Sequence, residues 1–441
     1  MTGDQKCMQS LDEKEIIKTP LAEKRKVLLI SYLFPPLGGS GSSRPLKMAK
    51  YLPKYGWKPV VLTVKNPDWY YAHDPELLKQ LSKEVEVLRS QMFRSTWIYR
   101  CLNPLRTKRM EGLIRRYLFH PDEQIGWLPF AYRSATQFMN NHKIHALYST
   151  SGPMTCHLIA MLLKRRFGIP WVAEFRDEWF EAPNLPLPTN LHKKMHYYLE
   201  KLVVKESDRI VTLAPEFAKL LLKHGVIPDK FTTIVKGYDP DDLSTSTLKE
   251  SNDENRFTVV FTGLIYESFP PNRLLSAVNS LIKDGCISPK KIIIRFVGAN
   301  VINRALDPFR VTECTGFVPQ TEAISSLFHA DLLLLLLSRE RGSGVIPSKI
   351  FEYMAAGKPI LALVPPEGAV SGIIQKTKTG TVVDFEDEGG IRRSFFELYS
   401  RWETGSLNLT PDWHEIGRFD QRLIFREIST ILDELTGVDR R

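Results

Sequence analysis

The 441-residue sequence lacks the cysteine pattern of a disulfide-bonded or zinc-binding protein. Its five cysteines are Cys7, Cys101, Cys156, Cys286 and Cys314, and no Cys-x-x-Cys pair occurs. An odd number of scattered cysteines argues against a disulfide framework and against a structural zinc site. The pattern predicts a protein of a reducing compartment.

Long apolar runs are also missing. The run of leucines at 332–337 has six residues, whereas a membrane-spanning helix needs about 20. Residues 1–20 are polar and charged and contain no apolar core of a signal peptide. We therefore predict a cytoplasmic protein, with at most a peripheral position at the inner face of a membrane.

The sequence offers no suitable acidic pair for a catalytic metal, since DPDD (239–242) lies in a polar segment. It shows no motif of a nucleic-acid-binding fold either, so we expect no nucleic-acid partner. The net charge is +10, and RTKRMEGLIRRYLF (106–119) alternates basic and apolar residues. This stretch predicts a basic amphipathic helix, either on an anionic membrane with tryptophans such as Trp97 or Trp127, or solvated on the protein's own surface.

What is present is the composition of a globular α/β protein. Hydrophobic residues make up 43% and charged residues 25%, and the length suits two domains of about 200 residues each. Both halves alternate apolar strand-like runs with helical spacing, which predicts two doubly wound domains. The main predicted strands are 26–34, 57–64, 146–150 and 170–175 in the first half, and 257–265, 291–298, 330–338 and 358–364 in the second.

The predicted division of the chain follows these patterns. A polar segment without apolar periodicity separates the two halves and is interpreted as the interdomain linker. The predicted parts are a flexible tail 1–25, a first domain 26–237, a linker 238–256, a second domain 257–410 and C-terminal helices 411–441.

The segment SGVIPSKIFEYMAAGKPILAL (343–363) has the features of a ligand-binding helix. Pro347 suits the first helical position and Gly357 the C-terminal cap, which predicts a helix from Pro347 to Ala356. Its free N–H groups would lie after the leucine strand, at the edge of the sheet where α/β domains bind ligands. Such a helix start, with glycines before it, can hold a phosphate group.

Two charged residues of this helix fit the same interpretation. Lys349 in the first turn would oppose the helix dipole unless an anion is near, and a bound diphosphate supplies one. Glu352 lies three residues on and could accept hydrogen bonds from two adjacent ribose hydroxyls. The alternative is a short amphipathic helix with an incidental lysine–glutamate pair.

An ordered set of segments resembles a known family. The segment 343–363 is similar to the donor-site segment of glycosyltransferase family 4, retaining enzymes of GT-B fold, and TGFVPQTEAISSLFHADLLLLLL and TGLIYES resemble the parts that precede it. YLFPPLGGSGSSRPLKMAKYLPKYGWKPVVLT resembles the N-terminal glycine-rich loop of that family. STSGPMTC with FRDEW resembles a branch with a TSPP-like turn and an FRDPW-like motif. The resemblance covers nearly all of residues 26–385.

This resemblance implies a fold and an activity. The fold is two Rossmann-like domains facing across a cleft, with a C-terminal helix crossing back to the first domain, so that closure is a hinge motion. The activity is transfer of a sugar from a nucleotide-sugar donor to a glycan or lipid-linked acceptor in surface polysaccharide or glycoconjugate synthesis. The resemblance further implies retention through a front-side attack with the departing phosphate as base, no metal and no cofactor.

The resemblance also assigns donor-site residues. Glu352 matches the second glutamate of a paired motif, which grips the ribose, while the first glutamate would fall at Gly344 and is missing. Backbone N–H groups around Ser343 and Gly344 would stand in for it. The remaining expected donor contacts are Phe317 and Val318 along the base, Arg273 and, more strongly, Lys349 at the phosphates, Ser348 at the helix start and Gly263 in the turn that opens the second domain.

In the first domain, the loop PPLGGSGSSRP would place N–H groups of Gly39 to Gly41 near the diphosphate and the acceptor, although a tight turn without a ligand gives the same pattern. Arg44 in the next helix could meet an anionic acceptor. The family's histidine after the fourth strand is absent, and we interpret His157 as packing. Arg176 and Asp177 follow a strand at the cleft, where Asp177 could accept or orient the acceptor hydroxyl proton. An internal Arg–Asp ion pair is the alternative.

Two other functions stay open from the sequence. A sugar-nucleotide epimerase of the same fold would need acid and base groups around the sugar C2, and no convincing set is visible. A catalytically inactive GT-B scaffold is kept open by the missing glutamate and histidine.

Overall fold

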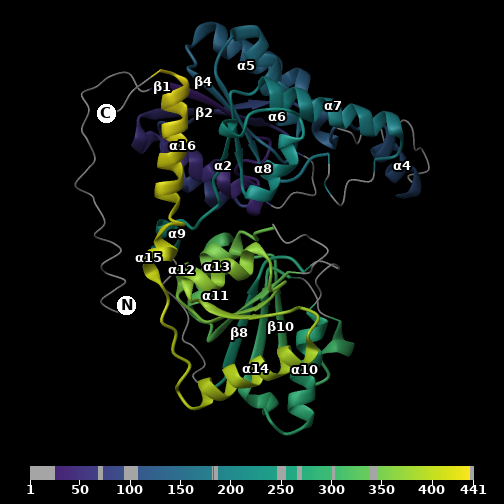
Figure 1. Ribbon diagram of the computed structural model, residues 1–441, viewed down its shortest axis with the longest axis vertical. Coiled ribbons are helices and arrows are strands. Elements are labelled where there is room, and N and C mark those ends of the chain that lie inside the picture. Colours follow the sequence, from purple (N-terminus) through teal and green to yellow (C-terminus); the bar gives the residue numbers. More distant parts are fainter. Residues whose placement is uncertain are drawn as a thin grey trace.

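The structure is a computed structural model that describes residues 25–67, 73–93, 108–180, 182, 187–245, 255–265, 271–299, 303–337 and 345–437. The expected tail, Trp97, Ser343 and Gly344 lie outside these ranges, so the predictions made for them stay predictions. Within the described ranges the chain forms two α/β domains, stacked one above the other in Figure 1.

The first domain is built on a seven-stranded sheet in which every neighbouring pair is parallel, in the order β3-β2-β1-β4-β5-β6-β7. Apolar runs form the central strands because both faces of the sheet are covered. The strands are β1 (Arg25–Ile30), β2 (Trp57–Val64), β3 (Glu86–Ser90), β4 (Ala146–Thr150), β5 (Trp171–Phe175), β6 (Arg209–Thr212) and β7 (Phe231–Thr233).

Helices cover both faces of this sheet. One face packs against α5 (Leu128–Asn141), α6 (Thr155–Phe167), α7 (Asn190–Glu206) and α8 (Pro215–Leu222). The other face packs against α2 (Ser40–Tyr51), the 3-10 helix η1 (Leu52–Tyr55) and α16 (Gln421–Leu435). The helix α4 (Lys108–Leu118) lies beyond the free end of α7 and projects from the domain (Figure 1). Short 3-10 helices span η2 (Pro75–Gln80), η3 (Glu123–Trp127) and η4 (Pro228–Lys230).

The second domain repeats the plan with six parallel strands in the order β10-β9-β8-β11-β12-β13. The strands are β8 (Phe257–Thr262), β9 (Ile292–Val297), β10 (Thr312–Gly316), β11 (Leu332–Leu336), β12 (Ile360–Leu363) and β13 (Gly380–Val383). Helices α10 (Asn272–Lys283) and α14 (Glu388–Glu403) cover one face. Helices α11 (Gln320–Phe328), α12 (Lys349–Ala356) and α13 (Ala369–Thr377) cover the other. Two 3-10 turns, η5 (Pro289–Lys291) and η6 (Arg304–Leu306), complete the domain.

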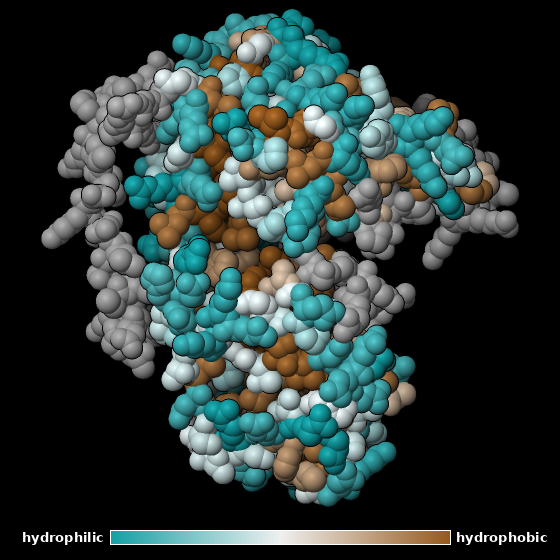
Figure 2. All heavy atoms as spheres, in the orientation of Figure 1, coloured by the Kyte–Doolittle hydropathy of each residue, from teal (hydrophilic) through white to brown (hydrophobic). Residues whose placement is uncertain are grey.

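This architecture confirms the predicted GT-B arrangement of two Rossmann-like domains. The surface of both is mostly hydrophilic, with hydrophobic residues showing in places and at the level where the domains meet (Figure 2). The apolar faces of the sheets are buried under the helices, which supplies each domain with its own core.

The end of the chain returns to the first domain, as the resemblance implies. Phe425, Ile428 and Leu432 of α16 are buried against the first sheet, and α16 runs along the upper domain in Figure 1. The region was expected to be a set of helices packing on the first domain. Instead α15 (Trp413–Gly417) packs on the second domain through Ile416, and only α16 reaches the first.

The start of the expected linker is structured. Residues Pro240–Thr245 form the short helix α9, which is pinned to α2 because Lys47 contacts Asp239 and Asp242 at 2.5 Å. Tyr238 and Asp420 form a bridge between the two segments that cross from one domain to the other. The chain therefore passes between the domains twice, at neighbouring points.

Candidate active site

Arg176 organises the loops at the carboxyl edge of the first sheet. It follows β5, and its guanidinium donates to the carbonyl oxygens of Gly41 and Ser151, both at 2.7 Å, and of Gly152 at 3.4 Å. It thereby ties the glycine-rich loop after β1 to the turn after β4. The predicted alternative of an Arg–Asp ion pair is replaced by bonds to backbone carbonyls, so Arg176 acts as a positioning residue in this structure.

The glycine-rich loop needs its glycines for two different reasons. Gly39 has a φ of 86°, a left-handed conformation that favours glycine, and it precedes the first residue of α2. A Cβ on Gly41 would overlap the Leu33 side chain. The start of α2 therefore lies at the same edge as Arg176, as expected, although whether Gly39 and Gly41 contact a donor stays a prediction.

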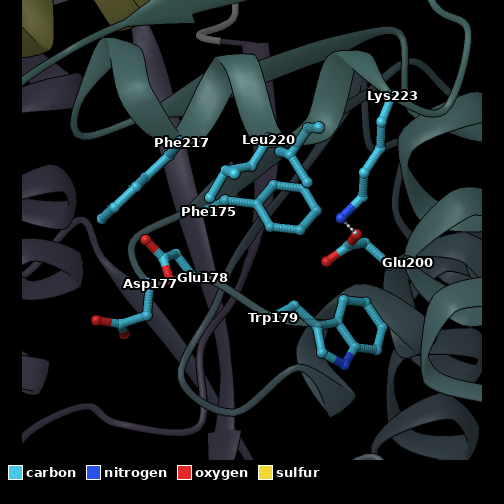
Figure 3. Close-up of a pocket in the computed structure, with 9 residues that line it drawn as sticks. Phe175, Asp177, Glu178, Trp179, Glu200, Phe217, Leu220 and Lys223 are labelled. Atoms are coloured by element: carbon cyan, nitrogen blue, oxygen red, sulfur yellow. Dashed lines mark ion pairs between the residues drawn. The ribbon is translucent and has the colours of Figure 1, made fainter. Parts of the chain in front are cut away.

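Asp177 is exposed beside the Gly152 turn. It lines a small pocket with Phe175, Trp179 and residues of α7 and α8, and its carboxylate points away from Trp179 and from the Lys223–Glu200 ion pair (Figure 3). The pocket has room for about one water molecule. A sugar acceptor therefore cannot enter it, and Asp177 is available from the open side.

Arg44 does not serve an acceptor. Its side chain is 1% exposed, and its Nε donates to Glu174 at 2.6 Å while its other nitrogens donate to the carbonyl oxygens of Ile234 and Val235. Glu174 also accepts from Tyr148 and Thr150. Burial opposes the charge of Glu174, but Arg44 outweighs it and lowers the pKa of that carboxyl. The predicted contact of Arg44 with an anionic acceptor is thus wrong, because its donors are used inside the domain.

Two further sequence interpretations concern buried rings. His157 is fully buried, contacts Ser149 through Nδ1 at 2.8 Å, and burial lowers its pKa to about 3. This agrees with packing rather than chemistry. Trp127, considered as a surface tryptophan, is instead fully buried and donates to Ser90, because the short helix η3 turns it into the core.

The helix α12 begins at the carboxyl edge of the second sheet. It starts at Lys349, two residues later than predicted, because Pro347 and Ser348 form the turn that precedes it. Ile350, Phe351 and Met354 anchor it in the core. Ser348 is its N-cap and makes no side-chain capping bond.

Lys349 is the most perturbed cation of this edge. Its ammonium donates to the carbonyl oxygen of Thr262 and lies over the Phe261 ring, 3.7 Å from the centroid. Burial lowers its pKa to about 7, with Glu352 acting in the opposite direction. A cation held this way is costly, and an anion at the helix start would stabilise it.

Gly263 and Gly298 let the ends of β8 and β9 approach each other and Lys349. Gly263 has a φ of 100°, and a Cβ on it would lie 3.3 Å from the Lys349 ammonium. A Cβ on Gly298 would lie 3.3 Å from the Gly263 backbone. The structure therefore brings together Gly263, Ser348, Lys349 and Glu352, as the sequence predicts.

The other expected donor contacts are placed less closely. Phe317 follows β10 at the same edge and is 57% exposed, and Val318 is half-buried. Arg273 at the start of α10 donates to the carbonyl oxygen of Glu386 and lies over the Phe385 ring. Its guanidinium is thus directed to the loop before α14, and a role at the donor phosphates stays a prediction.

Sequence reasoning missed Lys236. It lies after β7 in the first domain, yet it interacts electrostatically with Glu352 on α12 and with Arg176. Burial raises the pKa of Glu352, and Lys236 is the first group that opposes this rise. No local pattern could reveal the pairing, since Lys236 and Glu352 belong to different domains.

Contacts between the domains show that the two carboxyl edges face each other. The backbone N–H of Gln320, at the start of α11, donates to Asp74 of the first domain at 3.4 Å, and its side chain donates to Asp242 at 3.4 Å. Lys236 and Glu352 interact electrostatically across the same junction. Arg176 and the start of α12 therefore belong to one cleft region.

Two properties of the described part of the chain bear on other predictions. None of its helices has the length and apolar character needed to cross a membrane. No group of three or more histidine, cysteine or acidic side chains in those ranges is arranged to hold a metal ion. Metal independence itself remains a prediction.

Comparison with known proteins finds a family model that matches most of the first domain. Residues 41–237 match the model of a glycosyl transferase 4-like domain. These residues form a glycosyl transferase 4-like domain. The chain is 24% identical over 260 residues to a D-inositol 3-phosphate glycosyltransferase of Gordonia bronchialis, covering 54% of each protein. The chain therefore spans about half the length of that curated relative.

Solved structures share the two-domain fold of this chain. A sucrose-phosphate synthase from Thermosynechococcus elongatus superimposes with a TM-score of 0.61 at 13% identity, covering 94% of this chain and 99% of that one. Anabaena Alr3699/HepE, solved in complex with UDP-glucose, gives a TM-score of 0.57 at 12% identity, with 93% and 99% covered. At these identities the similarity establishes the fold alone.

Proposed function

We propose that this protein is a glycosyltransferase that moves a sugar from a nucleotide-sugar donor to a glycan or lipid-linked acceptor in surface polysaccharide or glycoconjugate synthesis. The observation that carries the proposal is the start of α12, where Lys349 and Glu352 lie at the carboxyl edge of the second sheet and Glu352 interacts electrostatically with Lys236 of the first domain. The UDP-glucose complex of Alr3699/HepE supports a nucleotide-sugar donor.

The reaction needs stabilisation of a departing diphosphate. As the sugar–phosphate bond breaks, negative charge grows on the diphosphate oxygens, and oriented N–H groups and cations lower the barrier. The start of α12 and the Lys349 ammonium supply such groups. Glu352 would accept from the ribose hydroxyls and fix the donor.

On the acceptor side, the first domain offers Asp177. It is exposed at the edge that Arg176 organises, so it can orient the acceptor hydroxyl or accept its proton. With retention through front-side attack, the departing phosphate takes that proton and Asp177 serves orientation. No protein nucleophile is then required.

The proposal includes contact with an anionic membrane, and the residues of α4 support this part of it. Met110, Leu113 and Tyr117 are exposed on this helix at spacings that place them on one face, whereas Ile114 is buried. Arg115 and Arg116 lie in its last turn. Exposed apolar residues beside arginines suit the headgroup region of an anionic bilayer.

The donor site is tested by thermal shift with UDP-, GDP- and ADP-sugars. A ligand that binds only the folded state adds about 2.7 kcal/mol at 100 times its dissociation constant. We expect one nucleotide series to stabilise the protein, and Glu352→Gln and Lys349→Ala to abolish the shift. Glu397→Gln on the exposed face of α14 serves as the control and should keep it.

Transfer is then measured with the selected sugar nucleotide and glycan or lipid-linked acceptors. A glycosylated product supports the proposal. Release of an epimerised sugar nucleotide would favour the epimerase, and binding without turnover would favour the inactive scaffold. A panel without any shift, or shifts that survive both substitutions, would contradict the proposed site.

Membrane contact is tested by flotation with phosphatidylglycerol and phosphatidylcholine vesicles. We expect binding to the anionic vesicles alone, with at least a tenfold loss in a Leu113→Glu, Tyr117→Glu double variant. Leu423→Glu, at an exposed position of α16, is the matched control. Equal binding of both variants would contradict the role of α4.

A further inference from the structure

Three histidines lie where the end of α4 meets α7. His120 follows α4 in the chain, and His192 and His196 lie one turn apart on α7. The ring of His120 lies 4.3 Å from the ring of His192 and 5.1 Å from the ring of His196, measured between centroids. His196 is fully buried and His120 is half-buried. The attachment of the projecting helix α4 to the domain therefore includes a group of imidazoles (Figure 1).

Two of these rings belong to a chain of hydrogen bonds. Nε1 of Trp179 donates to Nδ1 of His196 at 3.2 Å, and Nε2 of His196 lies 2.9 Å from Nδ1 of His120. Nε2 of His120 lies 3.0 Å from the backbone carbonyl oxygen of Arg116. The chain of bonds thus links the loop after β5, through α7, to the last turn of α4.

The two ends of this chain of bonds fix where its protons lie. An indole nitrogen can only donate, and a carbonyl oxygen can only accept. Nδ1 of His196 must therefore accept, so the proton of this neutral ring is on Nε2 and is donated to His120. His120 in turn donates from Nε2 to Arg116. Every nitrogen of the two rings has a complementary partner while both rings are neutral.

A further proton does not fit this arrangement. On His196 it would occupy Nδ1 and face the N–H of Trp179. On His120 it would occupy Nδ1 and face the N–H of His196. Either proton sets two donors against each other and leaves a buried N–H without an acceptor, which is destabilising. Protonation of the pair therefore disrupts the contact between the end of α4 and α7.

His192 differs from the pair, although it lies on the same helix as His196. Its Nε2 is 3.3 Å from the carbonyl oxygen of Tyr117, and its Nδ1 is 2.7 Å from the hydroxyl of Thr189. A hydroxyl group can accept as well as donate, so a protonated His192 keeps both bonds. His192 is thus the matched control for the two rings that cannot take up a proton in place.

The acidic groups on the elements around the pair have other partners or lie elsewhere. They are Glu200 with His224 and the Phe180 N–H, Asp122 with Thr155, Glu123 with Arg115, and Glu178 in the wall of the small pocket of Figure 3. The cations Arg116 and Lys193 are exposed. Burial and the charge of His192 lower the pKa of His120, against its bond to Arg116. Burial, helped by His120 and His192, lowers the pKa of His196 to about 4.

We propose that the imidazoles of His120 and His196 form a proton-sensitive joint that holds α4 on α7, and that protonation of this pair releases α4. The release itself does not depend on the proposed function. The helix α4 has 11 residues, and a detached helix of that length is marginal in water. Released α4 therefore exposes its backbone amides.

The direction of the pH dependence follows from the neutral pair. A released imidazole returns to an ordinary pKa of about 6.5. This value is above the value in the joint, so the released form binds more protons and is favoured as the pH falls. With a pKa of about 4 in the joint, His196 alone should raise the released fraction about 20-fold from pH 7 to pH 5. His120 adds to this effect.

The release has a consequence for membrane contact, and this part rests on the proposed function. A negatively charged bilayer concentrates protons at its surface as it concentrates other cations. An anionic surface would thus attract α4 and also favour its release. Release frees Ile114, which is buried in the folded protein, to join the exposed apolar residues of α4 at the bilayer.

The experiment follows hydrogen–deuterium exchange of residues 108–118 from pH 7.5 to pH 5, corrected for the intrinsic exchange rate. We expect α4 to lose at least tenfold in protection, while α5 keeps its protection. A His120→Gln, His196→Gln double variant should lose this pH response, because an amide can accept and donate in the same places but takes up no proton. His192→Gln is the matched control and should keep the response.

Four results would overturn the inference. They are unchanged protection of α4 in wild type, a pH response that survives in the double variant, a response that vanishes in His192→Gln, and a loss that α5 shares. If α4 is exposed at every pH in the double variant, ¹³C shifts of the histidine rings in wild type decide. The shifts of His120 and His196 should change over the pH range in which α4 loses protection, and unchanged shifts there would refute the joint.

Flotation with phosphatidylglycerol vesicles at pH 5 and pH 7.5 separates this inference from the proposed membrane contact. We expect wild type to bind more at pH 5, and the double variant to bind equally at both pH values. If α4 is released at pH 5 but no vesicle is bound, the membrane contact fails and the joint stands. If wild type binds equally at both pH values with unchanged protection of α4, the joint fails and the contact stands.

Discussion

The two sheet edges that meet at the cleft treat their charges in opposite ways. In the first domain, Arg44 and Lys47 are buried with carboxylate partners. In the second, Lys349 is buried against a carbonyl oxygen and an aromatic ring, and its pKa falls to about 7. The first edge uses charge to hold loops in place, whereas the second holds its cation against a carbonyl oxygen and an aromatic ring.

The largest effect on stability is expected when the carboxylate partner of a buried cation is removed at the carboxyl edge of the first sheet. Glu174→Gln leaves Arg44 buried with a neutral acceptor, which should cost about 3–5 kcal/mol of the free energy of unfolding. Urea denaturation measures this loss. The exposed pair Lys291–Glu403 is the control, and Glu403→Gln should cause no measurable change. A loss below about 1 kcal/mol for Glu174→Gln would show that the buried pair is not structural.

The next largest effect is expected at Arg176. Arg176→Met removes a charged donor to three backbone carbonyl oxygens, so we expect a loss of about 2–3 kcal/mol in stability. Because the guanidinium joins the loops on the acceptor side, transfer should fall while nucleotide binding changes less. Unfolding and calorimetry on the same preparations test both parts. Unchanged stability would remove Arg176 from the group of positioning residues.

At the carboxyl edge of the second sheet, we expect removal of the buried cation to raise the stability of the protein rather than lower it. Lys349→Met relieves the burial of a cation, so we expect a gain of about 1–2 kcal/mol at pH 7, after the lost contacts with Thr262 and Phe261 are subtracted. The same variant should lose donor binding. Thermal unfolding without and with the nucleotide sugar measures both. A less stable variant would mean that Lys349 is structural, like Arg44.

The smallest expected effect is a change with pH in the stability that Lys349→Met gains over wild type. The folded-state pKa of Lys349, about 7, is below its unfolded value, so between them the unfolded chain binds more protons and wild type gains stability as the pH rises. The advantage of Lys349→Met should therefore shrink by about 1 kcal/mol from pH 7 to pH 8. Denaturation curves at both pH values test it, and an advantage that grows with pH would refute the assigned pKa shift.

Strands were predictable where burial on both faces imposes an apolar run. The strands β2 and β4 have the predicted bounds, and the leucine run forms β11. The strand β3 was not predicted, because EVLRS lies at the sheet edge, half-buried, and mixes charged with apolar residues. The mixed composition of this half-buried edge strand explains why the sequence did not reveal it.

Contacts between distant residues account for what the sequence could not show. The segment 411–441 was expected only as C-terminal helices, and the sequence did not show that Asp420 would separate α15 from α16, where it caps α16 and bridges to Tyr238. Likewise Arg44 and Lys236 have partners more than 100 positions away. The helix start at Lys349 and Glu352 was predictable because a proline, a glycine and two charges lie within one short segment.

The double passage of the chain at Tyr238 and Asp420 has a mechanical consequence. Two adjacent crossing segments resist twisting of one domain against the other far more than bending about the line that joins the two segments. The domains therefore move relative to each other mainly by bending about that line. Such a constraint confines opening and shutting to essentially one direction, and every cycle of substrate entry and product exit would follow the same path.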